Sequence, residues 1–332
     1  MTPPTTPVAP PPPLAGAIDV HAHYITPRLR AAMQAAGHGQ PDGMPALPDW
    51  SPEAALAAMD RTGIAAALLS VSSPGVHYGD DDAARALARA VNDEGASLVQ
   101  AHPGRFGLLA SLPLPDLPGA LAETRHALDD LGADGITLLT SYAGRHLGDP
   151  CYEALMAELD RRSAVVLLHP TSPPCWEATG LGRPRPMLEF PFETTRAVTH
   201  LVLGGVLERY PGIRFIVPHA GGTLPALADR IAAFALASGG PPVDVLGALR
   251  GLYYDLAGFA LPRLLPALLT LTDTDHLLYG SDYPYTPDWV VHGLAEALAG
   301  SDCLTGNRRE PLPHGAAAAL FPRLAPATRA RD

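Results

Sequence analysis

Eight short apolar runs alternate along this chain with longer segments that have a helical pattern, and this alternation constrains the fold more than any other feature. Each run has four to seven residues, and none alternates strictly between apolar and polar positions. Continuous apolar runs of this length are typical of strands buried on both faces of a parallel sheet. The runs are Ala17–Val20, Ala65–Val71, Phe106–Leu112, Gly135–Leu139, Ala164–Leu168, Ile213–Val217, Leu252–Leu256 and His276–Tyr279.

The segments between the runs complete the pattern of a (β/α)8 barrel, also called a TIM barrel. No linker separates one strand–helix unit from the next, so we expect a single α/β domain over residues 16–325. The chain has 332 residues, and α/β barrels of more than about 200 residues commonly form one domain. The helical segments include Pro52–Arg61, Asp82–Ala101, Pro118–Leu131, Cys151–Arg162, Phe192–Tyr210, Leu224–Ala237 and Leu261–Thr270.

Two long inserts and one tail depart from the minimal barrel pattern. The inserts are Tyr24–Asp49 after the first run and Thr171–Phe192 after the fifth. Both follow the carboxyl ends of predicted strands, the face that carries the active site in TIM barrels, so we expect them to form lids or pocket walls. Residues 1–15 are rich in proline, threonine and alanine, which predicts a disordered, polyproline-like tail.

Arginine supplies all of the permanent positive charge, because the sequence contains no lysine. This absence excludes a Schiff-base lysine, a P-loop lysine and a carboxylated lysine that bridges two metal ions. Lys+Arg is 23 and Asp+Glu is 34, which gives a net charge of −11. An acidic chain of this kind is a poor candidate for binding nucleic acid or an anionic membrane, and we expect neither partner.

Three further absences concern location and redox state. The cysteines Cys151, Cys175 and Cys303 are too few and too scattered for a disulfide framework or a cysteine metal site. The first residues lack the charged and apolar regions of a secretory signal. No apolar stretch is long enough to cross a membrane. We therefore expect a soluble, cytoplasmic protein.

Histidines and an aspartate follow four of the predicted strands. His21 and His23 end the first strand, and their two-residue spacing puts both imidazoles on one side of an extended backbone, where they can chelate a divalent metal. Alone, the pair is equally compatible with two unrelated polar histidines. His169, His219 and Asp282 follow the fifth, sixth and eighth runs, and the carboxyl ends of barrel strands meet on one face. Together, these positions favour a metal site.

The motifs DVHAHY, LLHP, VPHAGG and YGSDYP resemble those of the amidohydrolase superfamily. The resemblance extends from about Ile18 to Phe321, and it is to the branch that contains aminocarboxymuconate-semialdehyde decarboxylase and related aromatic-acid decarboxylases. It implies one divalent metal ion, with zinc expected first and manganese also suited to the ligands. The implied ligands are His21, His23, His169 and Asp282, and the implied proton-transfer residue is His219.

The resemblance also bears on the substrate. Arg230 has the spacing from His219 at which the semialdehyde decarboxylase carries an arginine that binds a carboxylate across a homodimer interface; the other interpretation is an ordinary surface arginine. The arginine that this enzyme carries before a Trp-x-Pro segment is absent here, which argues against a dicarboxylate substrate. His77, Phe190 and Tyr285 lie in stretches that resemble the 6-methylsalicylate decarboxylase subgroup, and we expect them to contact an aromatic carboxylate.

The resemblance therefore implies a carboxy-lyase that removes carbon dioxide, without oxidation, from a small hydroxybenzoate such as 6-methylsalicylate. A proton from Asp282 or His219 would replace the carboxylate on the ring. The first alternative is a metal-dependent hydrolase of the same superfamily, acting on a lactone, amide or ester. A metal-binding protein without catalysis is the second alternative, and the complete set of ligands together with His219 counts against it.

Overall fold

Eight parallel strands form one sheet in the computed structural model, which describes residues 12–239, 242–304 and 315–325. Neighbours in the sheet follow the chain order, and bridges from β1 to the segment after β10 bring the two edges together. This arrangement confirms the predicted (β/α)8 barrel. The strands are β1 (Ile18–His23), β2 (Ala66–Ser70), β3 (Phe106–Ser111), β4 (Gly135–Leu139), β7 (Val165–His169), β8 (Arg214–Val217), β9 (Tyr253–Asp255) and β10 (Leu277–Leu278).

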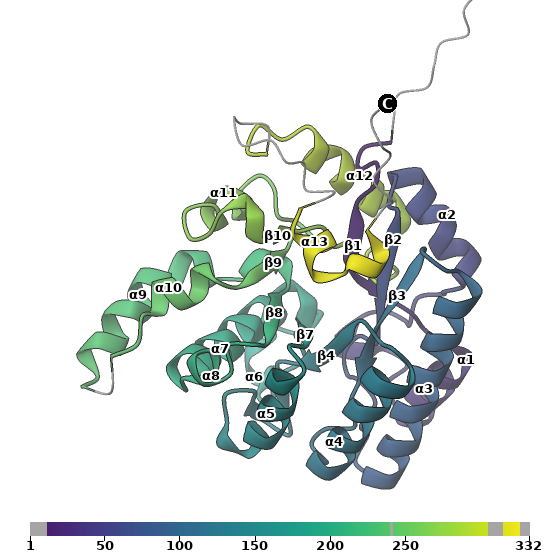
Figure 1. Ribbon diagram of the computed structural model, residues 1–332, viewed down its shortest axis with the longest axis horizontal. Helices are drawn as coiled ribbons and strands as arrows, with labels where there is room; N and C mark the ends of the chain where they lie inside the picture. The colour runs from purple at the N-terminus through teal and green to yellow at the C-terminus, as the bar shows by residue number, and fades with distance from the viewer. Residues whose placement is uncertain (1–11, 240–241, 305–314, 326–332) are drawn as a thin grey trace, which may run out of the picture.

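Helices cover the outside of the barrel, as Figure 1 shows. None of the helices in the described ranges is both long and apolar enough to span a bilayer. The helices are α1 (Pro27–Ala35), α2 (Pro52–Thr62), α3 (Asp81–Ala101), α4 (Leu117–Arg125), α5 (Glu153–Arg161), α6 (Trp176–Thr179), α7 (Glu189–Leu203), α8 (Val206–Arg209), α9 (Leu224–Ala237), α10 (Val245–Arg250), α11 (Leu264–Leu268), α12 (Asp288–Ala299) and α13 (Ala316–Leu320).

Some element boundaries differ from the sequence prediction. The predicted helix Phe192–Tyr210 is two helices, α7 and α8, because Gly205 between them has a φ of 67°, which breaks a right-handed helix. The predicted helix Pro118–Leu131 ends as α-helix at Arg125 and continues as a π-helical turn. A small hairpin of β5 (Ser141–Tyr142) and β6 (Arg145–His146) follows β4 and was not predicted.

The end of the predicted tail also differs. Residues 1–11 lie outside the described part of the chain. Leu14, by contrast, is buried, and its backbone N–H donates a hydrogen bond to the carbonyl of Thr62 over 3.0 Å. The turn that contains Leu14 therefore packs against the end of α2, and the prediction of disorder is wrong for this residue because its side chain joins the core.

The inside of the barrel is filled by apolar side chains from alternate strand positions and from the carboxyl-terminal segment. α13 contacts β1 and β10, so this segment closes the barrel at the amino ends of the strands (Figure 1). The opposite, carboxyl end remains available for polar side chains. The inner core consists of Ile18, Val20, Ala66, Leu68, Leu109, Val165, Leu167, Ile216, Leu278, Ala317, Leu320, Phe321 and Leu324.

Candidate metal centre

A β-bulge in β1 turns the two histidines of the first motif toward the barrel interior. The register of β1 against β2 shifts between Asp19 and Ala22, so β1 contains one residue more than its partner at this point. Val20 belongs to the inner core, and the extra residue lets the adjacent His21 face inward as well. Asp19 stabilises the bulge, because its Oδ1 accepts backbone hydrogen bonds from His21 and Ser281, each over 3.0 Å.

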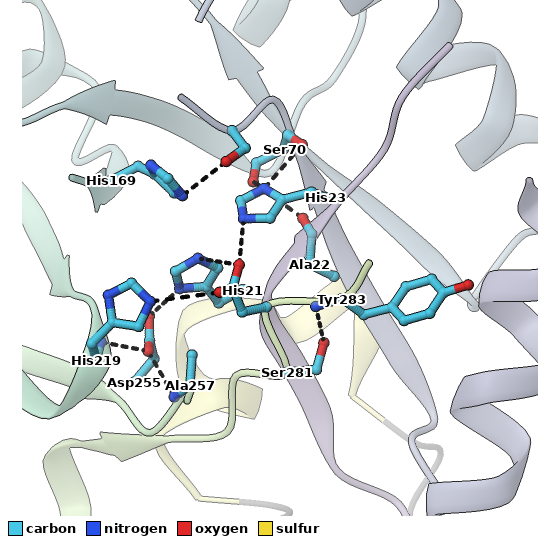
Figure 2. A network of polar contacts seen from close by, with 12 residues as sticks. His21, Ala22, His23, Ser70, His169, His219, Asp255, Ala257, Ser281 and Tyr283 are labelled. Carbon is cyan, nitrogen blue, oxygen red and sulfur yellow. Dashed lines mark hydrogen bonds and ion pairs between the residues drawn. The ribbon is translucent and has the colours of Figure 1, made fainter. Parts of the chain in front are cut away.

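Four side chains from three strand ends form the centre. His21, His23, His169 and Asp282 each offer one ligand atom, and these atoms all lie within 4.8 Å of one another. The three histidines are buried, whereas the side chain of Asp282 keeps 22% of its exposure. Figure 2 shows the rings of His21, His23 and His169 turned toward one another with His219 beside them. The structure therefore brings together all four predicted ligands.

Each of the three ligand imidazoles has its Nδ1 atom engaged by an oxygen atom. This contact fixes the ring orientation and leaves Nε2 for a metal ion. Nε2 of His21 is buried and has no hydrogen-bond partner among the described residues, so a bound cation would satisfy it. The Nδ1 contacts are His21 with Asp255 Oδ2 at 2.8 Å, His23 with Ser70 Oγ at 3.0 Å, and His169 with the Pro170 carbonyl at 2.7 Å.

Asp255 is the most important residue that sequence reasoning missed. It ends β9, it is fully buried, and its Oδ1 also accepts the backbone N–H of His219 over 3.0 Å. One carboxylate therefore orients both a metal ligand and the proposed proton-transfer residue. The signal was present in the sequence, because Asp255 is the one charged residue within the seventh apolar run, near its carboxyl end.

The charges of the centre depend on one another. Burial opposes the charged form of His21, but Asp255, together with Asp282 and Asp19, outweighs burial and raises the pKa of His21 to about 9. Burial and the neighbouring imidazoles lower the pKa of His169 well below its ordinary value. Burial would raise the pKa of Asp282, yet His219 and His23 hold it well below its usual range. An ionised carboxylate beside buried imidazoles is a ligand set that favours a dication.

His219 and Asp282 have backbone conformations that few residues other than glycine adopt. Their φ angles are 55° and 57°, in the left-handed region, and such strain occurs most often at functional sites. His219 Nε2 lies 3.9 Å from Asp282 Oδ2. His219 Nδ1 is buried, and no described residue offers it a hydrogen bond. Unlike the ligand histidines, this ring is not fixed in one tautomer.

A cavity of about 600 Å³ lies over the centre. His169, His219 and Asp282 form part of its floor, and residues of both predicted inserts line its sides. The two inserts also contact each other, since Ser172 of the second insert donates a hydrogen bond to Asp42 of the first. Arg185, in the same insert as Ser172, donates a hydrogen bond from its Nε to the Ser172 hydroxyl over 3.0 Å. The insert residues that line the cavity are Pro41, Asp42, Met44, Pro186, Met187, Phe190 and Pro191.

The four predicted substrate contacts divide into two pairs. Phe190 and Tyr285 line the cavity, and the Tyr285 ring lies 5.5 Å from that of His23. His77 lies elsewhere, with its Nε2 at 2.8 Å from Asp81, because the loop after β2 turns it toward α3. Arg230 is on the exposed face of α9 with its guanidinium 4.9 Å from the Phe234 ring, so it does not reach the cavity of its own chain.

Comparison with known proteins agrees with this geometry. The family model described as amidohydrolase matches residues 18–323. The chain belongs to this amidohydrolase family. A crystal structure described as amidohydrolase II superposes with a TM-score of 0.87 at 39% identity, over 92% of this chain and 99% of that chain. The resemblance inferred from the motifs is confirmed.

Among amidohydrolase relatives, the 6-methylsalicylic acid decarboxylase of Penicillium expansum is 36% identical over 315 residues, which are 92% of this chain and 96% of the relative. The 5-carboxyvanillate decarboxylase of Novosphingobium aromaticivorans, in complex with manganese and a nitrobenzoic acid, shares the fold with a TM-score of 0.82. It is 22% identical, over 93% of this chain and 97% of that chain.

Proposed function

We propose that this protein is a metal-dependent carboxy-lyase that decarboxylates a hydroxybenzoate-type acid such as 6-methylsalicylate. The observation that carries the proposal is the set of four metal ligands, with His219 beside it, at the floor of a cavity large enough for one aromatic ring. The nearly full-length similarity to a 6-methylsalicylic acid decarboxylase supports this choice of reaction over hydrolysis.

The lining of the cavity supports a flat substrate with a single carboxylate. Phe190, Tyr285, Met187 and Pro191 offer apolar and aromatic contacts. None of the described residues that line the cavity is an arginine, so the metal ion would be the main partner for a carboxylate. Asp42, on the wall, would repel a second carboxylate.

Zinc is the metal we propose first and manganese second, since both accept three imidazoles and a carboxylate. His21, His23, His169 and Asp282 would hold it. When bound, a dication would polarise the phenolic and carboxylate oxygens of the substrate.

Side chains of the protein would deliver one proton to the substrate. His219 Nε2 and Asp282 Oδ2 lie 3.9 Å apart at the cavity floor, so either side chain is placed to deliver a proton to the ring carbon that bears the carboxylate. This protonation removes the aromaticity of the ring. Breaking the bond to the carboxylate then releases carbon dioxide and returns the electron pair to the ring. The reaction consumes one proton and needs no oxidant.

The predicted role of Arg230 requires a second copy of the chain. Arg230 is exposed on α9, near the exposed side chains of Phe234 and Leu236. We propose a homodimer in which this face of α9 is covered and Arg230 approaches the partner's cavity. His77 remains the weakest of the proposed substrate contacts, because it lies outside the cavity over the metal centre.

A turnover assay tests the proposal. The purified protein, loaded with zinc or manganese, is incubated with 6-methylsalicylate, and the expected product is m-cresol, measured by chromatography. A chelator should abolish the product, and restored metal should recover it. Hydrolysis of lactones or esters, together with no product from a panel of hydroxybenzoates, would contradict the proposal and favour the hydrolase.

A further inference from the structure

A second cavity, of about 590 Å³, lies at the carboxyl ends of β2, β3 and β4, beside the cavity over the metal centre. The metal ligands do not line it. Its walls come from the loop after β2, the β5–β6 hairpin and the insert after β7, including Val71, Leu139, Tyr142, Pro173 and Trp176. It is similar in volume to the first cavity, although the proposed reaction does not use it.

A thin partition separates the two cavities. Ser73 lines the cavity over the metal centre, and Thr171 lines the second cavity. Their hydroxyl oxygens lie 2.8 Å apart, so a hydrogen bond between these side chains forms part of the boundary between the two cavities.

The second cavity differs from the first in charge. Of the described side chains that line it, none is an aspartate, glutamate or arginine, and its only titratable groups are His77 and Tyr142. His77 is already paired with Asp81, and the Tyr142 hydroxyl accepts the backbone N–H of Leu139 over 2.8 Å. An anion would lose its hydration here without gaining a cation as partner. The cavity therefore favours an uncharged ligand.

One polar group in this lining lacks a partner. Thr137 lies in the middle of β4 on its inward face, and its buried hydroxyl has no hydrogen bond with any described residue. A buried hydroxyl of this kind costs stability unless a ligand or water pairs with it. A ligand with one hydroxyl and an apolar body would match the apolar walls, and rotation of the Thr137 side chain would turn its buried hydroxyl toward that ligand.

We propose that the second cavity is a binding site for a neutral molecule of the size of a phenol. The product of the proposed decarboxylation belongs to this class, since removing the carboxylate turns an anion into a neutral phenol. The link to the product rests on the proposed function, whereas the site itself does not. The two cavities would thus separate charged substrate from uncharged product.

Binding of m-cresol to the full-length protein tests the site without any turnover. Trp176 lines the second cavity, so its fluorescence should change on binding, and Trp176→Phe should remove the signal. Trp289→Phe is the matched control, because Trp289 is 79% exposed and lies outside this cavity. The same titration with benzoate, an anion of similar size, should give a change at least tenfold weaker.

Two variants locate the ligand. Ser141→Phe should fill the second cavity and abolish m-cresol binding, whereas Thr137→Val should keep the fold and weaken binding about fivefold through loss of one hydrogen bond. Ligand-observed NMR provides a second measurement of affinity. Phe190→Ala, in the cavity over the metal centre, should leave this binding unchanged. Binding that depends on Phe190 and ignores Thr137 and Ser141 would overturn the proposal.

Inhibition kinetics separate this proposal from the proposed function. If both hold, a higher substrate concentration does not displace m-cresol or relieve its effect on decarboxylation, because substrate and product occupy different cavities. Purely competitive inhibition would overturn the separate product site. If the protein decarboxylates no hydroxybenzoate but m-cresol binding still depends on Thr137 and Ser141, the proposed function fails while the neutral-ligand site stands.

Discussion

The two halves of the carboxyl end of the barrel carry different chemistry on the same backbone architecture. On one side, β1, β7, β9 and β10 lead to histidines and aspartates that form the metal centre. On the other, β3 and β4 present the inward-facing Ser111 and Thr137, which line a cavity with no aspartate, glutamate or arginine among its described side chains. Strand geometry thus places side chains at the mouth of the barrel, and the residue type at each strand end decides what each half can bind.

The largest expected effect comes from removing a metal ligand. His23→Ala should reduce turnover to the level of chelator-treated protein, because three ligands remain where four lie within 4.8 Å. Metal content per chain, measured by atomic emission, should fall with it. His276→Ala is the control, since His276 pairs with Asp273 at the amino end of β10 and should keep full activity. Full activity in His23→Ala would mean that turnover does not depend on the metal centre, which would contradict the assigned difference between the two halves.

Replacing His219 should separate catalysis from metal binding. His219→Asn should lower kcat by about 10²–10⁴-fold, the range typical of a lost general acid or base. Its Nδ1 has no described partner and its Nε2 is 3.9 Å from Asp282, so metal content should stay at the wild-type level. Loss of metal together with loss of turnover would identify His219 as a ligand instead.

A smaller effect is expected from the residue behind His21. Asp255→Asn removes the charge that orients His21 over 2.8 Å, so metal affinity should fall by about 10–100-fold in a chelator-competition titration. Asp134→Asn is the matched control, because Asp134 is also a largely buried carboxylate in an ion pair, with Arg323, but at the amino end of the barrel. Equal losses of affinity in both variants would mean that Asp255 acts only through overall stability.

The smallest effect concerns the uncharged half. Thr137→Val replaces a buried, unpaired hydroxyl with a methyl group, so the free energy of unfolding should stay unchanged or rise by about 1 kcal/mol. Ser70→Ala should instead lower it by about 1 kcal/mol, because the Ser70 hydroxyl donates to the Ala22 carbonyl over 3.1 Å. Denaturant unfolding of the metal-free proteins measures both. A loss in Thr137→Val as large as in Ser70→Ala would show that Thr137 has a partner.

The sequence pattern predicted the strand order and the polar residues at the strand ends because both depend on local features, whereas the choice of ligands among those residues came from the family resemblance. An apolar run marks a buried strand, and the polar residue after it lies at the carboxyl end of the barrel, which made His169 and Asp282 recognisable. The bulge in β1 could not be predicted from a local pattern, because an extra residue is defined only relative to the register of β1 against β2. Asp255 was passed over because its role depends on contacts with His21 and His219, which are distant in sequence.

Placement of the predicted substrate contacts shows the same limit. Phe190 and Tyr285 reach the cavity because they are close in sequence to elements that form its floor or wall. His77 does not, because the turn after β2 sends it to a pairing with Asp81. The direction of a loop side chain is decided by tertiary packing, which composition and spacing do not encode.

The closure of the barrel by α13, at the amino ends of the strands, has a consequence for synthesis of the protein. The inner core begins with Ile18 of β1 and is completed by Ala317, Leu320, Phe321 and Leu324. The inner face of β1 is therefore covered only after α13 has been synthesised. A ribosome-bound chain that lacks α13 would keep the barrel interior open to water. Translation through α13 and Leu324 must therefore precede final closure, and until then a chaperone has an apolar opening to recognise.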